Sequence, residues 1–570
     1  MRYSSSKTMA QLMAAYAGST LSFWGVTWLL TGKFNWIPAF IFFMLVCSIG
    51  IGTRFIVRSY LRSYKDHTKE NALIYGAGEL GRQLLGNIQQ GHQLHPVGFI
   101  DDSSELVGRI ISGVKIYHTS DLPKLMAEKS VSVILIAMQN VPKDVHDKLA
   151  DLVSQKSVTI QKIPAVADIL SGRTKITNFH EVKIEDLLGR KPVAAIPRLL
   201  EANTTDKSVL VTGAGGSIGS EICRQIMRYH PSRLVLLESS EHALYQIERE
   251  ISNMLAEQGL TTDVVSALVN VCDTNLLARV LKDNRVETVF HAAAYKHVPM
   301  LENNVLAALS NNVIGTKSVV EASIKTGVLS LTMISTDKAV RPTNVMGASK
   351  RFAELICQAY AEKQHHTKIS MVRFGNVLGS SGSVVPLFRS QIKNGGPVTV
   401  THRDITRYFM TIPEASQLVI QASGMARGGE VFVLDMGKPI RILDLARSMI
   451  HLSGYQPYIR GEHEPDSDAS IEKMEIVISN LRPGEKLFEE LLLDGAAEAT
   501  RHPGIMKAKE QMLGFSELQS ELKYLQTCVD TDNELMAIDL LHRLPLEYEP
   551  AAGSKNAERN RRPMLRRGVG

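Results

Sequence analysis

Two long apolar stretches open the chain. Residues 9–30 and 34–53 carry no charged side chain, and the first would span roughly 33 Å as a helix, enough to cross a bilayer core. The turn between them holds one basic residue, Lys33, whereas basic residues flank the pair on both outer sides: Arg2, Lys7, Arg54, Arg58, Arg62 and Lys65. This pattern predicts a transmembrane helical hairpin over residues 1–65 with both ends in the cytoplasm. A cleaved signal peptide is the alternative for the first stretch, but it is long and a second apolar stretch follows it.

From residue 66 the pattern changes to short apolar runs that alternate with amphipathic stretches, which is typical of a parallel α/β sheet. In a first domain, 66–175, a strand beginning at Ala72 leads into glycines at 76, 78 and 81, and Asp101 ends a second strand 20 residues after the last glycine. Further strands are predicted over 131–137 and 158–163. The domain shows no catalytic constellation, so a nucleotide site and a scaffold without one both remain open. A linker over 176–206 follows.

The same order of strand, glycine turn and helix returns at Val209–Ser220 and begins a larger domain, 207–550. Gly213, Gly216 and Gly219 predict a turn at which a pyrophosphate approaches the backbone at the start of a helix. Glu238 lies 19 residues after Gly219, at the end of the next strand. Its carboxylate would accept hydrogen bonds from an adenosine ribose and repel a 2′-phosphate, so we predict NAD rather than NADP as cofactor.

Small and polar residues follow the later strands of this domain. A strand at 264–271 ends where such a sheet meets an adenine, and the alanines that end a strand at 288–293 would let a cofactor approach the backbone. The predicted cofactor contacts are Gly213, Gly216, Ser217, Ile218, Gly219, Glu238, Asn270, Val271, Ala292 and Ala293. Polar side chains lie beside them at His291, Tyr295, Lys296 and His297. A histidine at a strand end is more often structural, so none of these is the first catalytic candidate.

The strand at 331–335 is followed by Thr336, Asp337 and Lys338. A helix is predicted to begin near Val345, and it places Met346 and Lys350 one turn apart on the same face. Helices are also predicted over 444–450 and 516–525, where they would cover a substrate lobe.

Composition changes this picture little. With 570 residues, 44% hydrophobic and 21% charged, the chain is too long for one core. The formal net charge is +6, but +5 of it falls in the last sixteen residues, so no basic groove for nucleic acid is indicated. The tail, 551–570, is predicted to be disordered, with weak attachment to anionic lipid as the alternative. Five cysteines lie far apart, which favours reduced thiols over a disulfide framework or a metal site.

The chain from Lys207 to about Leu493 resembles the extended short-chain dehydrogenase/reductase superfamily, whose Tyr-x-x-x-Lys pair would occupy the positions of Met346 and Lys350. A thioether neither donates a proton nor ionises, so the superfamily's usual proton acceptor is absent. With the apolar stretches, the first glycine domain and the motifs VKIEDLLGRKPV, HAAAYKHVP and LRPGEK, the chain resembles the large membrane-anchored nucleotide-sugar 4,6-dehydratases of bacterial polysaccharide biosynthesis and protein glycosylation. Members of that family generally have four membrane helices, and this sequence predicts two, which indicates a shortened anchor or a misplaced start.

This resemblance implies an α/β fold: the transmembrane hairpin, a small Rossmann-like domain, and an extended short-chain dehydrogenase/reductase Rossmann domain with a smaller substrate lobe. It implies a lyase that uses NAD to dehydrate a UDP sugar, usually UDP-N-acetylglucosamine, to a UDP-2-acetamido-2,6-dideoxy-4-keto-hexose, with retention at C5. Hydride would leave C4 and return to C6, while water leaves C6. The inner membrane would hold the protein, with its catalytic domain in the cytoplasm, and the expected partners are lipid and further copies of the chain rather than nucleic acid.

The resemblance also assigns roles to residues. Lys338 becomes the base at C5, Asp337 the acid for the C6 hydroxyl and Thr336 the partner of the C4 oxygen, while Lys350 holds the nicotinamide ribose beside Met346. These roles require a lowered pKa at Lys338 and a raised one at Asp337. Candidate substrate contacts are Lys296, Asn376, Ser380, Ser383, Val384, Thr399, Thr401, Arg407, Arg482 and Glu485.

An arginine can hold a diphosphate through forked donors, and the resemblance places Arg482 there. Arg407, taken singly, is equally well a surface charge. Two other functions use the same features. A nucleotide-sugar epimerase shares the cofactor and the pocket, and a membrane-tethered NAD sensor or scaffold would keep the glycine turns without the Thr336–Lys338 site.

Overall fold

The computed structural model describes residues 6–32, 36–49, 70–138, 159–162, 180–181 and 193–551, apart from 39, 47, 91–93, 104, 130, 381, 454, 463–471 and 492–496. The chain divides into two compact units. One comprises residues 1–141 and 158–181, and the other comprises 142–157 and 182–570. The predicted tail beyond residue 551 and Cys47 lie outside the described residues.

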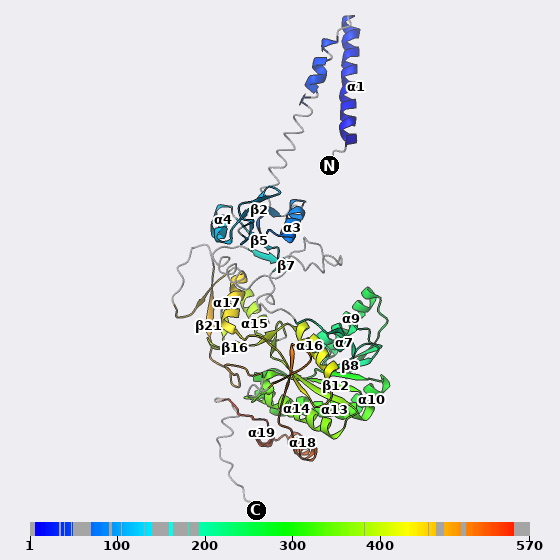
Figure 1. Cartoon of the computed structure of the whole chain (residues 1–570), viewed down its shortest axis with the longest axis vertical. Helices are drawn as coiled ribbons and strands as arrows, with labels where there is room; N and C mark the ends of the chain where they lie inside the picture. The colour runs from blue at the N-terminus through cyan, green and yellow to red at the C-terminus, as the bar shows by residue number, and fades with distance from the viewer. Residues whose placement is uncertain are drawn as a thin grey trace, which may run out of the picture. The chain divides into compact units, whose positions relative to one another are not determined.

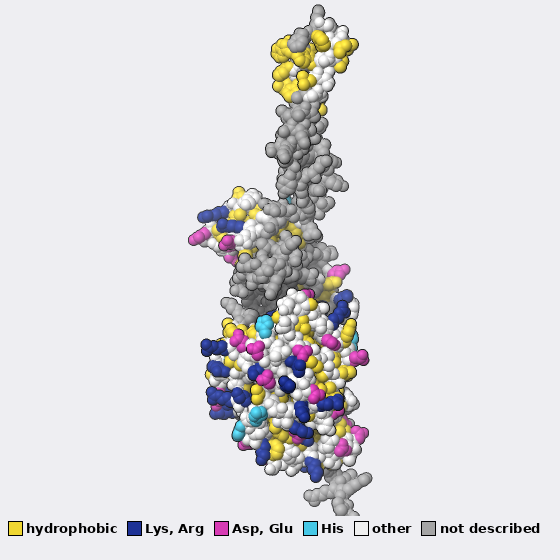
Figure 2. All heavy atoms as spheres, turned by 90° about the vertical axis from the view of Figure 1, so that its right-hand side faces the viewer, with side chains coloured by type: hydrophobic (Ala, Val, Ile, Leu, Met, Phe, Trp, Pro, Cys, Tyr) yellow, Lys and Arg dark blue, Asp and Glu magenta, His cyan; other side chains and the backbone are white. Residues whose placement is uncertain are grey.

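The first apolar stretch forms helix α1, Ser6–Thr31. Residues 40–46 are also helical, and the Phe23 ring stacks on the Phe42 ring with centroids 4.3 Å apart, so the chain folds back along α1. Apolar side chains of this segment lie on its surface, and Leu29 and Leu30 are 81% and 80% exposed (Figure 2). Within the described residues, no helix has both the length and the apolar character that a membrane crossing requires, so the predicted transmembrane hairpin is not confirmed.

The first unit contains a seven-stranded sheet in the order β3-β4-β2-β1-β5-β6-β7. Its five inner strands pair in parallel: β4 Val114–Tyr117, β2 Leu94–Ile100, β1 Glu70–Tyr75, β5 Val133–Ile136 and β6 Thr159–Lys162. The other described elements are β3 Ile110–Ile111, β7 His180–Glu181, α3 Glu79–Gln90, the short helix η1 Thr119–Asp121 and α4 Leu122–Glu128. Apolar residues from β1, β2, β5 and α3 share one buried core. The predicted strands at 131–137 and 158–163 and the α/β class are confirmed for this unit.

The second unit is built on a nine-stranded sheet in the order β10-β9-β8-β11-β12-β13-β18-β23-β22. Seven strands pair in parallel: β8 Ser208–Thr212, β9 Arg233–Glu238, β10 Asp263–Leu268, β11 Thr288–His291, β12 Ser330–Ile334, β13 Lys368–Arg373 and β18 Val431–Leu434. Two antiparallel strands, β23 Ile505–Ala508 and β22 Ala497–Ala499, complete one edge. The strand order reverses between β8 and β11, and such a switch point opens a crevice at the carboxyl ends of the strands.

Helices cover both faces of this sheet (Figure 1). One face carries α10 Thr274–Asp283, α13 Gly315–Thr326 and α14 Val345–Lys363, and the other carries α8 Ser217–Met227, α9 Glu241–Gln258 and α16 Ile412–Met425. Strand β8 is therefore buried on both sides: Leu210 belongs to one core, and Val209 and Val211 to the other. The helix starts predicted near Ser217 and Val345 are confirmed.

A smaller lobe follows from β13 onward. It contains the sheet β15-β21-β20, formed by Val398–Val400, Lys473–Ile478 and Gln456–Ile459, with helices α15 Val384–Lys393 and α17 Ile442–Leu452 packed on it. Two short strand pairs, β14 Asn376–Val377 with β17 Phe409–Met410 and β16 Thr406–Arg407 with β19 Ile440–Arg441, join the lobe to the main sheet. Helix α17 confirms the helix predicted over 444–450.

The helix predicted over 516–525 exists as α18, Phe515–Asp530, but it does not cover the substrate lobe. Its Leu518 and Leu522 belong to the core that α14 and the main sheet share, and α19, Glu534–Arg543, joins that core through Ile538 and Leu541. The predicted placement was wrong because the apolar face of a helix does not indicate which core of the molecule it meets.

Candidate active site

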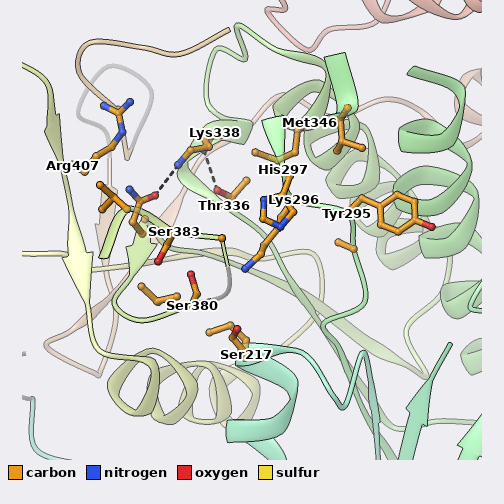
Figure 3. Close-up of a pocket in the computed structure, with 18 of the residues that line it drawn as sticks. Ser217, Tyr295, Lys296, His297, Thr336, Lys338, Met346, Ser380, Ser383 and Arg407 are labelled. Carbon is orange, nitrogen blue, oxygen red and sulfur yellow. Dashed lines mark hydrogen bonds between the residues drawn. The ribbon is translucent and has the colours of Figure 1, made fainter. Parts of the chain in front are cut away.

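A cavity of about 1110 Å³ lies at the carboxyl ends of β8, β11, β12 and β13 and extends to the small lobe. Pockets for one small ligand are typically about 300–1,000 Å³, so this cavity has room for a dinucleotide together with a second ligand. The predicted site residues that line it are Gly213, Gly216, Ser217, Ile218, Gly219, Ala292, Lys296, Thr336, Lys338, Met346, Lys350, Asn376, Ser380, Ser383, Val384, Thr399, Thr401, Arg407, Arg482 and Glu485. Figure 3 shows Thr336, Lys338, Lys296 and Ser383 around the same open space.

The glycine turn after β8 forms one wall of the cavity. Gly213 has a φ of 63°, and a Cβ on Gly219 would lie 2.1 Å from the carbonyl oxygen of Gly213. A side chain at Gly219 would therefore push helix α8 away from β8. Because the first turn of α8 reaches the cavity, its N-terminal N–H groups and dipole suit the pyrophosphate of a dinucleotide.

Two further predicted cofactor residues, Glu238 and Ala293, lie against this turn. Glu238 accepts hydrogen bonds from the backbone N–H of Gly215 at 3.1 Å and of Ser239 at 2.9 Å, so its carboxylate braces the glycine turn. Ala293 packs against the turn, because a Cβ on Gly213 would lie 2.8 Å from its nitrogen. Asn270 and Val271 are not among the described residues that line the cavity; Val271 is buried beside α13 and Asn270 accepts from the N–H of Cys272 at 2.9 Å.

His291 has the structural role expected of it. Its ring is buried between the hydroxyl groups of Thr212 at 2.8 Å and Thr316 at 3.1 Å. Burial, together with the positive charge of nearby Lys350, lowers the pKa of His291 to about 3. The ring is therefore neutral near pH 7 and ties β8 and β11 to the helix behind them.

Thr336, Asp337 and Lys338 form a connected group at the end of β12, where the chain turns through the short helix η4, Asp337–Ala339. The Thr336 hydroxyl donates to Asp337 Oδ1 at 2.8 Å, and the Lys338 ammonium donates to the same oxygen at 3.0 Å. Lys338 also donates to Asn376 Oδ1 at 3.0 Å. The group thus contains a hydroxyl, a carboxylate and an amine that can pass protons between them, and its hydroxyl and amine reach the cavity.

The protonation of Lys338 differs from what a base requires. Burial alone would lower its pKa, but the carboxylates of Asp337 and Glu489 outweigh burial and raise the pKa above the usual value. The Lys338 side chain is 18% exposed, whereas Asp337 and Glu489 are 1% and 4% exposed. In the protein without ligands Lys338 is therefore an ammonium ion, and it must lose a proton before it can act as a base.

Helix α14 brings the two positions of the usual Tyr-x-x-x-Lys pair to this group. The Asn344 side chain caps the helix by accepting from the N–H of Gly347 at 2.8 Å. A Cβ on Gly347 would lie 2.2 Å from the carbonyl oxygen of Lys338, so the absence of a side chain allows α14 to pack directly against η4. Met346 and Lys350 then line the cavity, and the Lys350 ammonium donates to the Ile334 carbonyl at 2.6 Å. Burial lowers the pKa of Lys350 to about 8.

The predicted substrate residues form the opposite wall. Arg407 is not a surface charge: it is buried, and it donates to Glu485 Oε1 at 3.2 Å and to the Thr406 carbonyl at 2.7 Å. Arg482 is exposed at the rim, and its backbone N–H donates to Glu485 Oε2 at 3.1 Å. Lys296 lines the cavity from the β11 side, and partial burial lowers its pKa.

Sequence reasoning missed two buried features next to the Thr336–Lys338 group. Glu489 lies behind Lys338 with its Oε1 3.7 Å from the Lys338 nitrogen. Glu354 of α14 accepts from Arg373 Nε at 2.7 Å and from the Ser335 hydroxyl at 2.6 Å, and so holds the residue that precedes Thr336. Neither feature has a local signal, because Glu489 lies in irregular chain, and Lys338, Arg373 and Ser335 come from other segments of the chain. Only the LRPGEK motif, a few residues before Glu489, indicated that this segment belongs to the site.

Comparison with known proteins places the chain in a family. Residues 209–510 match the family described as polysaccharide biosynthesis protein, and residues 67–160 match a CoA binding domain. The capsular polysaccharide biosynthesis protein CapD of Staphylococcus aureus is 43% identical over 447 residues, which cover 77% of this chain and 72% of CapD. A UDP-glucose 4-epimerase of Rickettsia canadensis is 32% identical over 56% of this chain and 98% of its own length. Among solved structures, Pen from Bacillus thuringiensis is 28% identical and covers 56% of this chain and 98% of its own, with a TM-score of 0.47. On the family match and the similarity to CapD, the chain belongs to the polysaccharide biosynthesis protein family of extended short-chain dehydrogenases/reductases.

Proposed function

We propose that this protein is an NAD-dependent UDP-sugar 4,6-dehydratase that acts on UDP-N-acetylglucosamine in the synthesis of a bacterial surface polysaccharide. One observation carries the proposal. The cavity keeps Lys350 of the usual pair, has Met346 where the usual phenol would stand, and places the connected group Thr336, Asp337 and Lys338 beside them. The proton transfers that the phenol would otherwise make are thereby assigned to a carboxylate and an amine.

The residues around the glycine turn fit NAD. Gly213 and Gly219 leave the backbone bare where a pyrophosphate would lie, Glu238 supplies the acidic group for an adenosine ribose, and Lys350 can donate to the nicotinamide ribose. NAD, when bound, would supply the chemistry of storing the C4 hydride until it is returned to C6. The protein residues must then move the protons.

The hydrogen bonds of the Thr336–Lys338 group provide a path for those protons. As C4 is oxidised, its hydroxyl proton passes through the Thr336 hydroxyl to Asp337 Oδ1, 2.8 Å away. Asp337 then carries a proton that it can give to the C6 hydroxyl, which leaves as water once Lys338, having first released its own proton, has taken the C5 proton. After the hydride returns to C6, Lys338 gives its proton back to C5. The C4 hydroxyl proton ends in the water molecule, and the enzyme regains its starting state.

The product formed from UDP-N-acetylglucosamine tests the proposal. The purified full chain should convert it, with NAD, to a nucleotide sugar lighter by one water, in which NMR detects a C4 ketone and a C6 methyl group. Deuterium placed on C4 should appear on that methyl group. Unchanged substrate, or a deuterium label lost to solvent, would refute the proposed reaction.

A nucleotide-sugar 4-epimerase is the second candidate, favoured by the similarity to the Rickettsia canadensis epimerase. Its product would have the same mass as the substrate and no C6 methyl group, so the same experiment separates the two. Met346 argues against this candidate, because an epimerase of this fold needs a proton acceptor at that position.

We also propose that residues 1–65 attach the protein to the inner membrane, with the catalytic unit in the cytoplasm. The exposed apolar side chains Leu21, Trp28, Leu29 and Leu30 support this attachment. Flotation of the full chain with phospholipid vesicles, compared with a chain that begins at residue 66, tests it, and equal flotation of the two would contradict it.

A further inference from the structure

Glu489 is a buried carboxylate behind the proposed catalytic group. Its side chain is 4% exposed, and it is not among the described residues that line the cavity. Oε1 lies 3.7 Å from the Lys338 nitrogen and 3.7 Å from Arg407 Nε, so this oxygen sits between two cations. Glu489 therefore contacts two cations that line the cavity without lining it itself.

The second oxygen of Glu489 is unsatisfied. Oε2 is buried and has no hydrogen-bond partner among the described residues, and the same is true of Asp337 Oδ2. A buried carboxylate oxygen without a donor is costly, and it favours binding a proton. Burial raises the pKa of Glu489, which agrees with this geometry.

Charged groups face Glu489 from every element around it. Lys338 and Asp337 come from η4, Arg407 comes from β16, and Lys486 lies in the same irregular segment as Glu489. Lys338, Arg407 and Lys486 favour its anionic form, while Asp337 and burial favour its neutral form. When Asp337 receives the C4 proton, its negative charge is lost, which lowers the pKa of Lys338 and favours proton release. The same change removes the carboxylate that favours the neutral form of Glu489, so burial and the unsatisfied Oε2 are what hold a proton there.

We propose that Glu489 is a positioning residue that takes the surplus proton of Lys338, so that Lys338 meets the sugar C5 as a free amine. The inference rests on the proposed 4,6-dehydration and deepens it. One N–H bond of the Lys338 ammonium breaks and one O–H bond forms on Glu489, which becomes a neutral acid. Lys338 then takes the C5 proton and later returns it to C5. The proton on Glu489 finally returns to Lys338, so no proton is gained or lost over the cycle.

Glu489→Gln in the full chain tests this inference, because the amide has nearly the same shape and cannot accept the proton. We expect kcat at neutral pH to fall by about 10²-fold with KM for the UDP sugar nearly unchanged, since a lost proton transfer typically costs about 10²–10⁴-fold. Lys338 would then have to lose its proton to solvent. The kcat of the variant should therefore rise about tenfold per pH unit above neutral, whereas the wild-type kcat stays flat.

Two further variants keep the test decisive. Glu489→Asp retains the carboxylate and should retain the flat pH profile even where its kcat is lower, which separates proton transfer from packing. Glu490→Gln changes the adjacent residue, whose carboxylate is 40% exposed and pairs with Arg341 and Lys486, and it should leave both kcat and the pH profile unchanged.

A fully active Glu489→Gln enzyme, or one whose pH profile runs parallel to the wild type, would overturn the role of Glu489 and leave the proposed reaction intact. A higher rate of Glu489→Gln than of the wild type near neutral pH would also overturn the role of Glu489. If Glu489 only stabilises the ammonium form, its removal lowers the pKa of Lys338 and raises the rate near neutral pH. A wild-type enzyme that forms no 4-keto product overturns the proposed function, and this inference with it.

Discussion

The two glycine turns of this protein pack a helix against a strand in the same way. A Cβ on Gly81 would lie 2.0 Å from the Gly76 carbonyl oxygen, and a Cβ on Gly219 would lie 2.1 Å from that of Gly213. In each unit the acidic residue at the end of the second strand braces the turn. Asp101 accepts from the N–H of Ala77 at 2.8 Å, as Glu238 accepts from that of Gly215 at 3.1 Å.

The surroundings of the two turns differ. The Met138 side chain lies over the first turn, where a Cβ on Gly76 would be 3.0 Å from its Cγ, and β5 ends there in apolar residues. Beside the second turn, strands β11 and β12 are followed by Ala292 and Thr336, which line a large cavity. A glycine turn therefore defines how a strand meets a helix, and the ends of the neighbouring strands decide whether chemistry follows.

The largest effects on turnover should come from substitutions in the Thr336–Lys338 group of the second unit. Lys338→Met and Asp337→Asn should each lower turnover of UDP-N-acetylglucosamine by about 10²–10⁴-fold, because each removes a proton-transfer group. Affinity for NAD should stay close to that of the wild type, since neither side chain touches the glycine turn. Turnover is measured as 4-keto product per enzyme, and NAD affinity by titration calorimetry. Near-normal turnover in either variant would remove that residue from the mechanism.

A matched pair of glycine variants tests the comparison itself. Gly219→Ala and Gly81→Ala introduce nearly the same clash, which costs about 1–3 kcal/mol of stability as overpacking. Only Gly219→Ala should weaken NAD binding, by at least about tenfold, because it moves α8 away from the proposed pyrophosphate site. Thermal unfolding and NAD titration of both variants measure the two quantities. An equal loss of NAD affinity in Gly81→Ala would show that the first turn is also part of the cofactor site.

Much of the difference between the two units could be predicted from the sequence. The part that could not be predicted depends on contacts between residues far apart in the chain. Strand, turn and helix are local, so β8, α8, β9 and the start of α14 lie close to where the apolar pattern predicted them. Thr336 and Lys338 follow a strand of the parallel sheet, and the family resemblance assigned their roles and that of Lys350, all of which line the cavity. Glu489 was missed because its role depends on burial next to Lys338, 151 positions away, and the pKa of Lys338 is raised by Asp337 beside it and by that same contact. The placement of α18 failed for the same reason, since packing partners at long range leave no periodic signal.

The acidic residues beside the two turns allow a finer test. Glu238→Ser should lower the preference for NAD over NADP by about tenfold, because a carboxylate that accepts from ribose hydroxyls and repels a 2′-phosphate is removed. Asp101→Ser should leave that preference unchanged. The ratio of the two dissociation constants, measured for each variant, checks both statements, and tighter binding of NADP than NAD by the wild type would contradict the assignment of the cofactor.

The smallest effect is expected at Met346. Met346→Leu conserves volume at a side chain that is 4% exposed, and volume-conserving changes in a packed site usually cost less than about 1.5 kcal/mol. Turnover should stay within about threefold of the wild type, because a thioether transfers no proton and leucine fills the same space. The kcat of this variant, measured beside that of Lys338→Met, then separates the two positions. A loss as large as that of Lys338→Met would mean that the sulfur contacts the reacting sugar or the nicotinamide, and that the second unit draws its chemistry from α14 as well as from the end of β12.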